Sequence, residues 1–240
     1  MARRSGSSRK NRPQRSAPAR WLIATLKAGI ALGVGYLLAC TLLLVAYRWV
    51  EPPATTVQVQ RLMEAAIASE PFDLRYEPVG DSEQDVDIRH AAIASEDGRF
   101  YTHNGFDWEE IRRAREDAER QGRAPRGAST ITQQLVKNLF LTTHRSYIRK
   151  GMEVPLTLIA EGVLPKDRIL TLYLNAAEWG PGVFGIEAAA RHHYGTSADA
   201  LTRAQAARLV AVLPAPLSRR PQDMGQTAAR IQRRMSQMGW

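Results

Sequence analysis

The sequence predicts an all-α, mainly helical domain that follows a single N-terminal membrane-spanning helix. Two observations carry this prediction. The segment Ala28–Tyr47 contains no charged side chain, and its length matches the roughly 20 residues that a helix needs to cross the hydrocarbon core of a bilayer. From residue 57 onward, apolar residues recur mostly at spacings of three and four. Alternating patterns typical of strands are rare, so the periodicity favours helices throughout.

Basic residues are concentrated around the predicted membrane helix. The chain has 240 residues and a net charge of +9. Residues 1–50 hold nine of the 33 basic side chains and none of the 24 acidic ones, so residues 51–240 carry 24 of each. Because nucleic-acid-binding domains present a basic surface, the neutral body predicts that no nucleic acid is a partner.

Composition divides the chain into four segments. Residues 1–20 are rich in Arg, Ser and Pro and have no apolar run, which predicts a disordered tail. Residues 21–50 are the predicted membrane helix, 51–84 a membrane-proximal connector, and 85–240 the main domain. Basic residues beside a membrane helix stay in the cytoplasm. We therefore expect a cytoplasmic N-terminus and a domain on the far side of the membrane.

Two other interpretations of the apolar segment are less favoured. A cleaved signal peptide would have a shorter apolar run and a cleavage site. Leu37–Cys40 is similar to a lipoprotein signal, but the apolar run continues over residues 41–46. Cys40 is the only cysteine, so the chain can form neither an internal disulfide nor a thiolate metal site.

Periodicity and capping residues predict the helices of the domain. Asp107 and Ser129 are expected N-caps, Thr202 with Gln205 forms a capping box, and Pro155 should kink its helix. We expect the segment 71–87 to be irregular. The predicted helices are 57–69, 90–97, 107–121, 129–139, 146–159, 167–175, 186–194, 202–213 and 226–238.

Acidic, aromatic and imidazole side chains follow the predicted helix 90–97. The run is Glu96-Asp97-Gly98-Arg99-Phe100-Tyr101-Thr102-His103-Asn104-Gly105. Acids at the C-terminus of a helix are unfavourable beside the negative end of its dipole. This cost favours a functional role for Glu96 over a plain solvated helix end.

The predicted helix 129–139 carries a polar stripe. Thr130, Gln134 and Lys137 recur at i, i+4 and i+7 and therefore share a face. A hydroxyl, an amide and an ammonium group in one row suit sugar and phosphate oxygens. A plain solvated helix would carry more Glu and Lys and fewer Thr.

Arg149 and Glu153 lie one helical turn apart. Alone, such a pair is a surface ion pair that contributes only about 0.3–0.5 kcal/mol. By itself it predicts no function.

Together these three segments resemble the family 51 glycosyltransferases, which polymerise peptidoglycan. The family motifs are Glu-Asp-x-x-Phe-x-x-His-x-Gly, Gly-x-Ser-Thr-Ile-Thr-Gln-Gln-x-x-Lys-Asn and Arg-Lys-x-x-Glu. Residues 96–105, 127–138 and 149–153 are similar to them in that order. Further similar segments are 169–175, 180–189 and 201–216, so the resemblance covers about residues 85–221. The chain has no room for the transpeptidase domain of bifunctional relatives, and we expect a monofunctional enzyme.

The resemblance implies a lysozyme-like fold and a role for each matching residue. It implies that Glu96 is the general base that takes the proton of the 4-hydroxyl of the acceptor lipid II. Undecaprenyl diphosphate then leaves the growing chain with inversion of configuration. Glu153 is implied as a second catalytic carboxylate, which orients basic residues or a divalent cation. The implied substrate-binding residues are Asp97, Phe100, His103, Thr130, Gln134, Lys137, Asn138, Arg149 and Lys150.

The resemblance also implies a location and partners. We expect a single-pass protein of the cell inner membrane with its catalytic domain in the periplasm. The implied partners are lipid II, the growing glycan chain and membrane lipid, with cell-division proteins as further candidates. No cofactor is required, and Mg²⁺ is a candidate ion near the diphosphate. His103, His192 and His193 lack the spacing of a zinc site, so no metal site is predicted.

Two rival functions remain open. A lysozyme-like lytic transglycosylase would cleave peptidoglycan with a single glutamate, but it has no diphosphate to hold. Lys137 and Arg149 therefore favour synthesis over cleavage. A non-catalytic membrane scaffold of the division machinery would not need Glu96 and Glu153 together.

Overall fold

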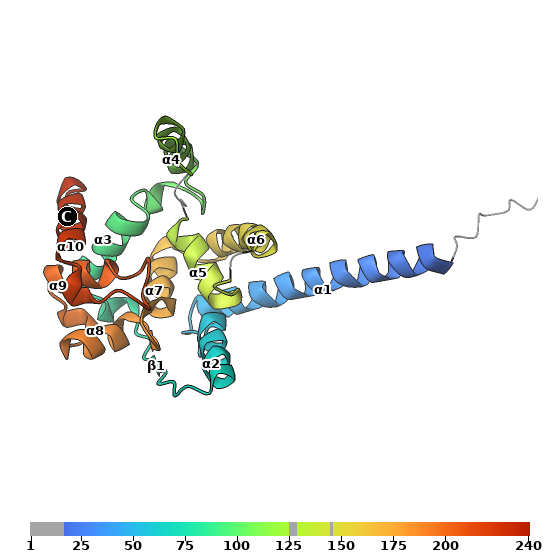
Figure 1. The fold of residues 1–240 in the computed structure, drawn as a ribbon, viewed down its shortest axis with the longest axis horizontal. Coiled ribbons are helices and arrows are strands. Elements are labelled where there is room, and N and C mark those ends of the chain that lie inside the picture. The colour runs from blue at the N-terminus through green and yellow to red at the C-terminus, as the bar shows by residue number, and fades with distance from the viewer. Residues whose placement is uncertain (1–16, 125–128, 145) are drawn as a thin grey trace, which may run out of the picture. The chain divides into compact units, whose positions relative to one another are not determined.

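The computed structural model describes residues 17–124, 129–144 and 146–240 (Figure 1). The chain divides into two compact units, Met1–Ala39 and Cys40–Trp240. The predicted disorder of residues 1–16 lies outside the described residues. In the rest of the chain the predicted fold class is confirmed, because helices dominate and strands are few and short.

The first helix, α1 (Ala17–Tyr47), contains the predicted membrane span. Within the described ranges, Trp21–Tyr47 is the one helix long and apolar enough to cross a membrane. It begins at Ala17, so the expectation of disorder for residues 17–20 is wrong. The physical reason is that a proline, here Pro18, is tolerated in the first turn of a helix. The helix also continues past Cys40 without a break, which favours an anchor over a lipoprotein signal.

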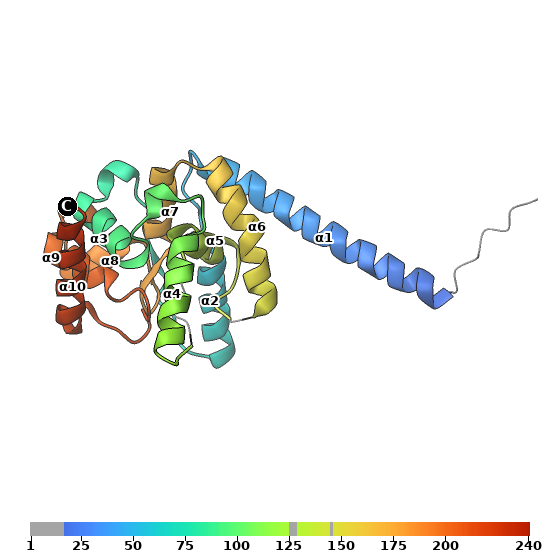
Figure 2. The ribbon, with the colours of Figure 1, turned by 90° about the horizontal axis from the view of Figure 1, so that it is seen from above.

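The remaining helices form two groups. In the first, α5 (Ile131–Phe140) packs on α2 (Thr56–Ala68), α6 (Tyr147–Val163) and α7 (Lys166–Ala176). In the second, α3 (Val86–Glu96) packs on α9 (Arg203–Val210) and α10 (Gly225–Gln237), and α8 (Ile186–Tyr194) lies beside them (Figure 2). Figure 1 shows α4 (Trp108–Arg120) standing outside both groups.

A small sheet joins the connector to the domain. Its strands are β1 (Arg75–Tyr76), β2 (Glu178–Gly180) and β3 (Val183–Phe184), in the order β1-β3-β2. β1 runs parallel to β3 and β2 antiparallel to it. Strands of two or three residues are too short to show an alternating pattern, so the sequence did not predict them. Because β1 and α2 belong to the segment 51–84, that segment packs as part of the domain.

Several helix boundaries differ from the sequence prediction. α3 begins four residues earlier than expected, because Asp85 caps it by accepting the Asp87 N–H. Thr130, not Ser129, is the N-cap of α5. α6 contains Pro155 and ends at Val163, four residues beyond the predicted end at residue 159. The predicted N-cap Asp107 and the Thr202/Gln205 capping box are confirmed.

The N-cap residue Thr130 makes one hydrogen bond more than an ordinary N-cap does. Its hydroxyl accepts the Gln133 N–H and also donates to the Gly105 carbonyl at 2.7 Å, and the residue is buried. We predict that Thr130→Ala lowers the free energy of unfolding by about 2 kcal/mol, against about 0.5 kcal/mol for Thr202→Ala, whose similar cap is exposed. Thermal unfolding of the two variants in the same detergent measures the difference. Equal shifts would show that the Gly105 bond adds nothing.

Candidate functional site

Glu96 is the last residue of α3, and neighbouring side chains fix its carboxylate. Ser95 Oγ donates to one carboxylate oxygen at 3.2 Å, and Gln134 Nε2 donates to the other at 3.0 Å. Tyr173 on α7 donates its hydroxyl to Gln134 Oε1 at 3.2 Å. Burial raises the pKa of Tyr173 well above its usual range, so this hydroxyl remains a donor. Three helices thus hold a half-buried carboxylate in one orientation.

Asp97 and His103 connect the loop after α3 to the start of α5. Asp97 accepts from His103 Nε2 at 2.8 Å and from the Ile131 N–H at 3.0 Å. The Gly105 N–H donates to His103 Nδ1 at 3.1 Å, so Nε2 is the ring nitrogen that carries the proton. Gly105 has φ +87°, and a Cβ there would lie 2.6 Å from Thr157 Cγ2. These contacts make Asp97 and His103 positioning residues for the loop.

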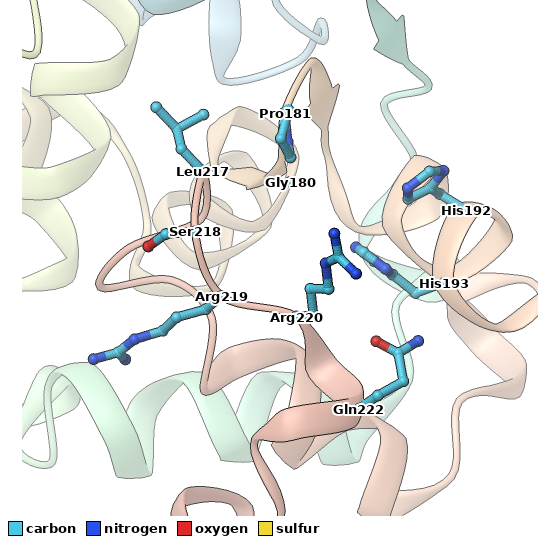
Figure 3. Close-up of a pocket in the computed structure, with 9 residues that line it drawn as sticks. All are labelled: Gly180, Pro181, His192, His193, Leu217, Ser218, Arg219, Arg220 and Gln222. Carbon is cyan, nitrogen blue, oxygen red and sulfur yellow. The ribbon is translucent and has the colours of Figure 1, made fainter.

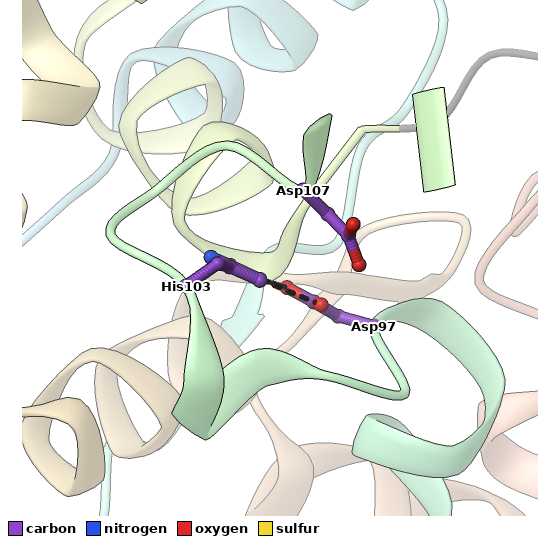
Figure 4. Close-up of side chains that lie close together, drawn as sticks. All are labelled: Asp97, His103 and Asp107. Carbon is purple, nitrogen blue, oxygen red and sulfur yellow. Dashed lines mark hydrogen bonds and ion pairs between the residues drawn. The ribbon is translucent and has the colours of Figure 1, made fainter. Parts of the chain in front are cut away.

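Asp97, His103 and Asp107 also lie close enough to suggest a metal site (Figure 4). One ligand atom from each falls within 4.8 Å of the others. However, the Asp97 oxygens already accept the two bonds just described. Asp107 caps α4 through the Glu110 N–H at 2.7 Å and is paired with Arg99. The Arg99 hydrogen bond holds the pKa of Asp107 below its usual range. Carboxylates paired with a guanidinium and with N–H donors do not fit a resident metal ion.

Lys137 lies one turn after Gln134 on α5 and presents a desolvated positive charge. Its ammonium makes no hydrogen bond or ion pair with residues in the described ranges. Burial lowers the pKa of Lys137, and the nearby charges of Glu153 and Glu96 only partly oppose that effect. A partly buried cation without a direct partner is costly, which is typical of a site that binds an anion.

Glu153 on α6 forms ion pairs with two further cations near Lys137. It is 3% exposed and forms ion pairs with Arg149 and with Lys150, whose Nζ lies 2.6 Å from Oε2. Arg149 Nε also donates to the His144 carbonyl at 2.7 Å. Three cations and one carboxylate leave this cluster with two net positive charges when the lysines are protonated. Glu153 therefore acts on the cations and has no surface left for a ligand.

The structure brings together most of the residues that the sequence singled out. Glu96 and Gln134 are bonded, and Lys137 interacts electrostatically with both Glu96 and Glu153. Phe100 is the main correction. It has no exposed surface and packs under the Lys166 ammonium, 4.6 Å from the ring centre, so it supports the loop and cannot contact a substrate. Asn138 is half-buried, and the structure gives its side chain no hydrogen bond to the described residues.

A cavity of about 530 Å³ opens beside Glu96. Its walls include residues of α4 and α10 that the sequence did not single out, because only the tertiary fold brings these distant helices to the loop. Residues in or just after these two helices are Glu110, Arg113, Asp117, Arg123, Arg234, Gln237 and Met238, and Ser129, Thr130 and Gln134 also line the cavity.

A second cavity of about the same volume lies elsewhere (Figure 3). It is lined by Gly180, Pro181, His192, His193, Leu217, Ser218, Arg219, Arg220 and Gln222. None of the predicted site residues lines it. Volume does not distinguish the two cavities, so the chemistry of the walls does. Only the first is lined by the fixed carboxylate of Glu96, and Lys137, Arg149 and Lys150 line neither of the two.

Comparison with known proteins identifies the family of the chain. Residues 67–239 match the sequence profile of the transglycosylase family. The chain is 43% identical over 228 residues to a biosynthetic peptidoglycan transglycosylase of Pseudomonas putida, covering 91% of this chain and 94% of that protein. Proteins of the same name in Pseudomonas aeruginosa and Bordetella pertussis are 45% and 46% identical, over 85% and 82% of this chain and 89% and 83% of their own lengths. The profile spans well over half of the residues, and the chain belongs to the transglycosylase family.

Proposed function

We propose that this protein is a peptidoglycan glycosyltransferase that polymerises lipid II into glycan strands. One observation carries the proposal. The carboxylate of Glu96 is bonded to Gln134, one turn before Lys137 on α5, and the charge of Lys137 acts on Glu153, which pairs with Arg149 and Lys150. A transfer from a lipid diphosphate needs a base for the incoming hydroxyl and positive charge for the leaving group.

Glu96 takes the role of the general base. The 4-hydroxyl of the acceptor sugar loses its proton to the Glu96 carboxylate while its oxygen attacks the anomeric carbon of the donor. The bonds from Ser95 and Gln134 keep the carboxylate oriented without neutralising it. Attack on the face opposite the leaving group inverts the configuration.

Lys137, Arg149 and Lys150 form the cation cluster, which stabilises the leaving group. The bond from the anomeric carbon to the diphosphate oxygen breaks, and undecaprenyl diphosphate departs as an anion that needs no proton. Lys137 contributes a point charge, and Arg149 contributes a planar guanidinium suited to phosphate oxygens. Glu153 holds Arg149 and Lys150 in place and is a positioning residue in this reaction.

The membrane helix has a direct use in this reaction. The lipid tails of both substrates lie in the bilayer, and an anchored enzyme meets them at a raised effective concentration. The basic residues near α1 support a cytoplasmic N-terminus, with the domain in the periplasm at the inner membrane. Membrane lipid, lipid II and the glycan chain are the proposed partners, and association with cell-division proteins stays a prediction.

No cofactor is required in the proposed reaction, because the cluster itself supplies the positive charge. A Mg²⁺ ion would accompany the diphosphate and be held by its phosphate oxygens, because Glu153 is already paired with Arg149 and Lys150. Polymerisation with added Mg²⁺ and with EDTA tests this point. Complete loss of activity in EDTA would contradict a reaction driven by the protein's cations alone.

The function is tested with the full chain in detergent and labelled lipid II. We expect long glycan polymer, and inhibition by moenomycin, which mimics the donor in this family. A lytic enzyme would instead release fragments from purified peptidoglycan, and a scaffold would do neither. Failure to form polymer from lipid II would overturn the proposed function.

A further inference from the structure

Arg234 on α10 lies in the cavity of Glu96 and occupies space left by a glycine. A Cβ added to Gly98 would lie 3.3 Å from Arg234 Nη2. Gly98 follows Glu96 and Asp97 directly, and all of them line the same cavity as Arg234. The guanidinium therefore lies over the turn that carries the proposed base.

α10, the helix that carries Arg234, packs on the rest of the domain. The guanidinium of Arg234 has no hydrogen-bond or ion-pair partner among the described residues. Ile231 and Met235 are buried, and the ring of Trp240 stacks on His90 of α3 with 4.2 Å between ring centres and 4° between planes. The side chain of Arg234 is exposed, and its five donors remain available for a ligand.

The direction of α5 indicates which part of the substrate reaches Arg234. The helix begins next to Asp97, and its last residue, Phe140, packs against Tyr47 at the end of α1, with 6.5 Å between ring centres. Lys137 lies one turn beyond Gln134 toward the Tyr47 end. The lipid-linked diphosphate belongs at that end, because its tail lies in the membrane. The saccharide and its substituents would then bind in the cavity at the start of α5.

We propose that Arg234 binds a carboxylate on the peptide substituent of the glycan that occupies this cavity. This inference rests on the proposed function and refines it. In peptidoglycan the saccharide carries its negative charge, away from the diphosphate, on the peptide carboxylates. A guanidinium can bind a carboxylate with two parallel hydrogen bonds. Arg234 then favours peptide-bearing substrate without taking part in bond making or breaking.

The test compares two substrates and two variants of the full chain. The substrates are lipid II and the same lipid-linked disaccharide without its peptide. The variants are Arg234→Ala and Arg233→Ala, which removes the neighbouring exposed arginine that does not line the cavity. We expect Arg234→Ala to raise KM for lipid II about tenfold, with kcat and the KM of the peptide-free substrate unchanged. Arg233→Ala should match the wild type on both substrates.

Salt provides a second readout that a structural role would not move. The preference of the wild type for the peptide-bearing substrate should shrink as salt rises, and Arg234→Ala should show no such dependence. Equal loss of activity on both substrates, or no change on either, would overturn the role of Arg234. If the wild type makes no polymer from either substrate, the proposed function itself fails, which is a separate outcome.

Discussion

Glu96→Gln will abolish glycan polymerisation while leaving the protein folded. General-base catalysis by a positioned side chain contributes about 10²–10⁴-fold, and the amide of glutamine cannot accept the proton of a sugar hydroxyl. The fold survives because the amide oxygen can still accept the Gln134 bond, which is 3.0 Å long in the wild type. The measurement is the rate of polymer formation from labelled lipid II, with thermal unfolding of the same sample.

Glu110→Gln is the matched control for this result. It makes the same chemical change on α4 in the wall of the same cavity, at a carboxylate to which the proposed reaction gives no role. We expect its polymerisation rate to stay within about twofold of the wild type. If Glu96→Gln kept full activity, or if both variants lost it equally, Glu96 could not be the base.

Lys137→Met will reduce polymerisation and stabilise the protein at the same time. Loss of one preorganised charge from a developing anion costs about a hundredfold or more in rate. Stability rises by about 1 kcal/mol at neutral pH, because an ammonium that burial disfavours is replaced by an apolar side chain. The two effects are measured by polymerisation rate and thermal unfolding.

The pH dependence of stability separates Lys137 from other lysines. Its pKa is lowered in the folded state, so the unfolded chain binds more protons between that lowered pKa and about 10.4. The stability of the wild type therefore rises with pH through this window, relative to Lys137→Met. Activity should fall over the same window, because the neutral amine no longer attracts the diphosphate.

Lys150→Met provides the comparison within the cluster. Lys150 is 49% exposed and paired with Glu153, whereas Lys137 has no such pair. We expect a loss of about tenfold for Lys150→Met, with no gain in stability. A larger loss for Lys150→Met than for Lys137→Met would show that the diphosphate is held on α6 alone.

Local patterns predicted those parts of the site that lie close together in the sequence. The spacing of Gln134 and Lys137 placed both on one face of α5, and the spacing of Arg149 and Glu153 placed them on one face of α6. Helical geometry alone dictates these relationships. The resemblance wrongly implied that Phe100 binds substrate, because a motif does not reveal which of its members support the loop from within the core.

Sequence by itself determined the membrane helix, the mainly helical class and the chemical character of the site, since these depend on composition and on periods of three to four residues. Tertiary structure alone decided that Glu96 meets Gln134 from another helix, that burial lowers the pKa of Lys137, and that Arg234 reaches the turn at Gly98. Burial and long-range proximity are the physical reason. Both arise when helices far apart in the chain pack on a shared core, and no local pattern encodes which faces will meet.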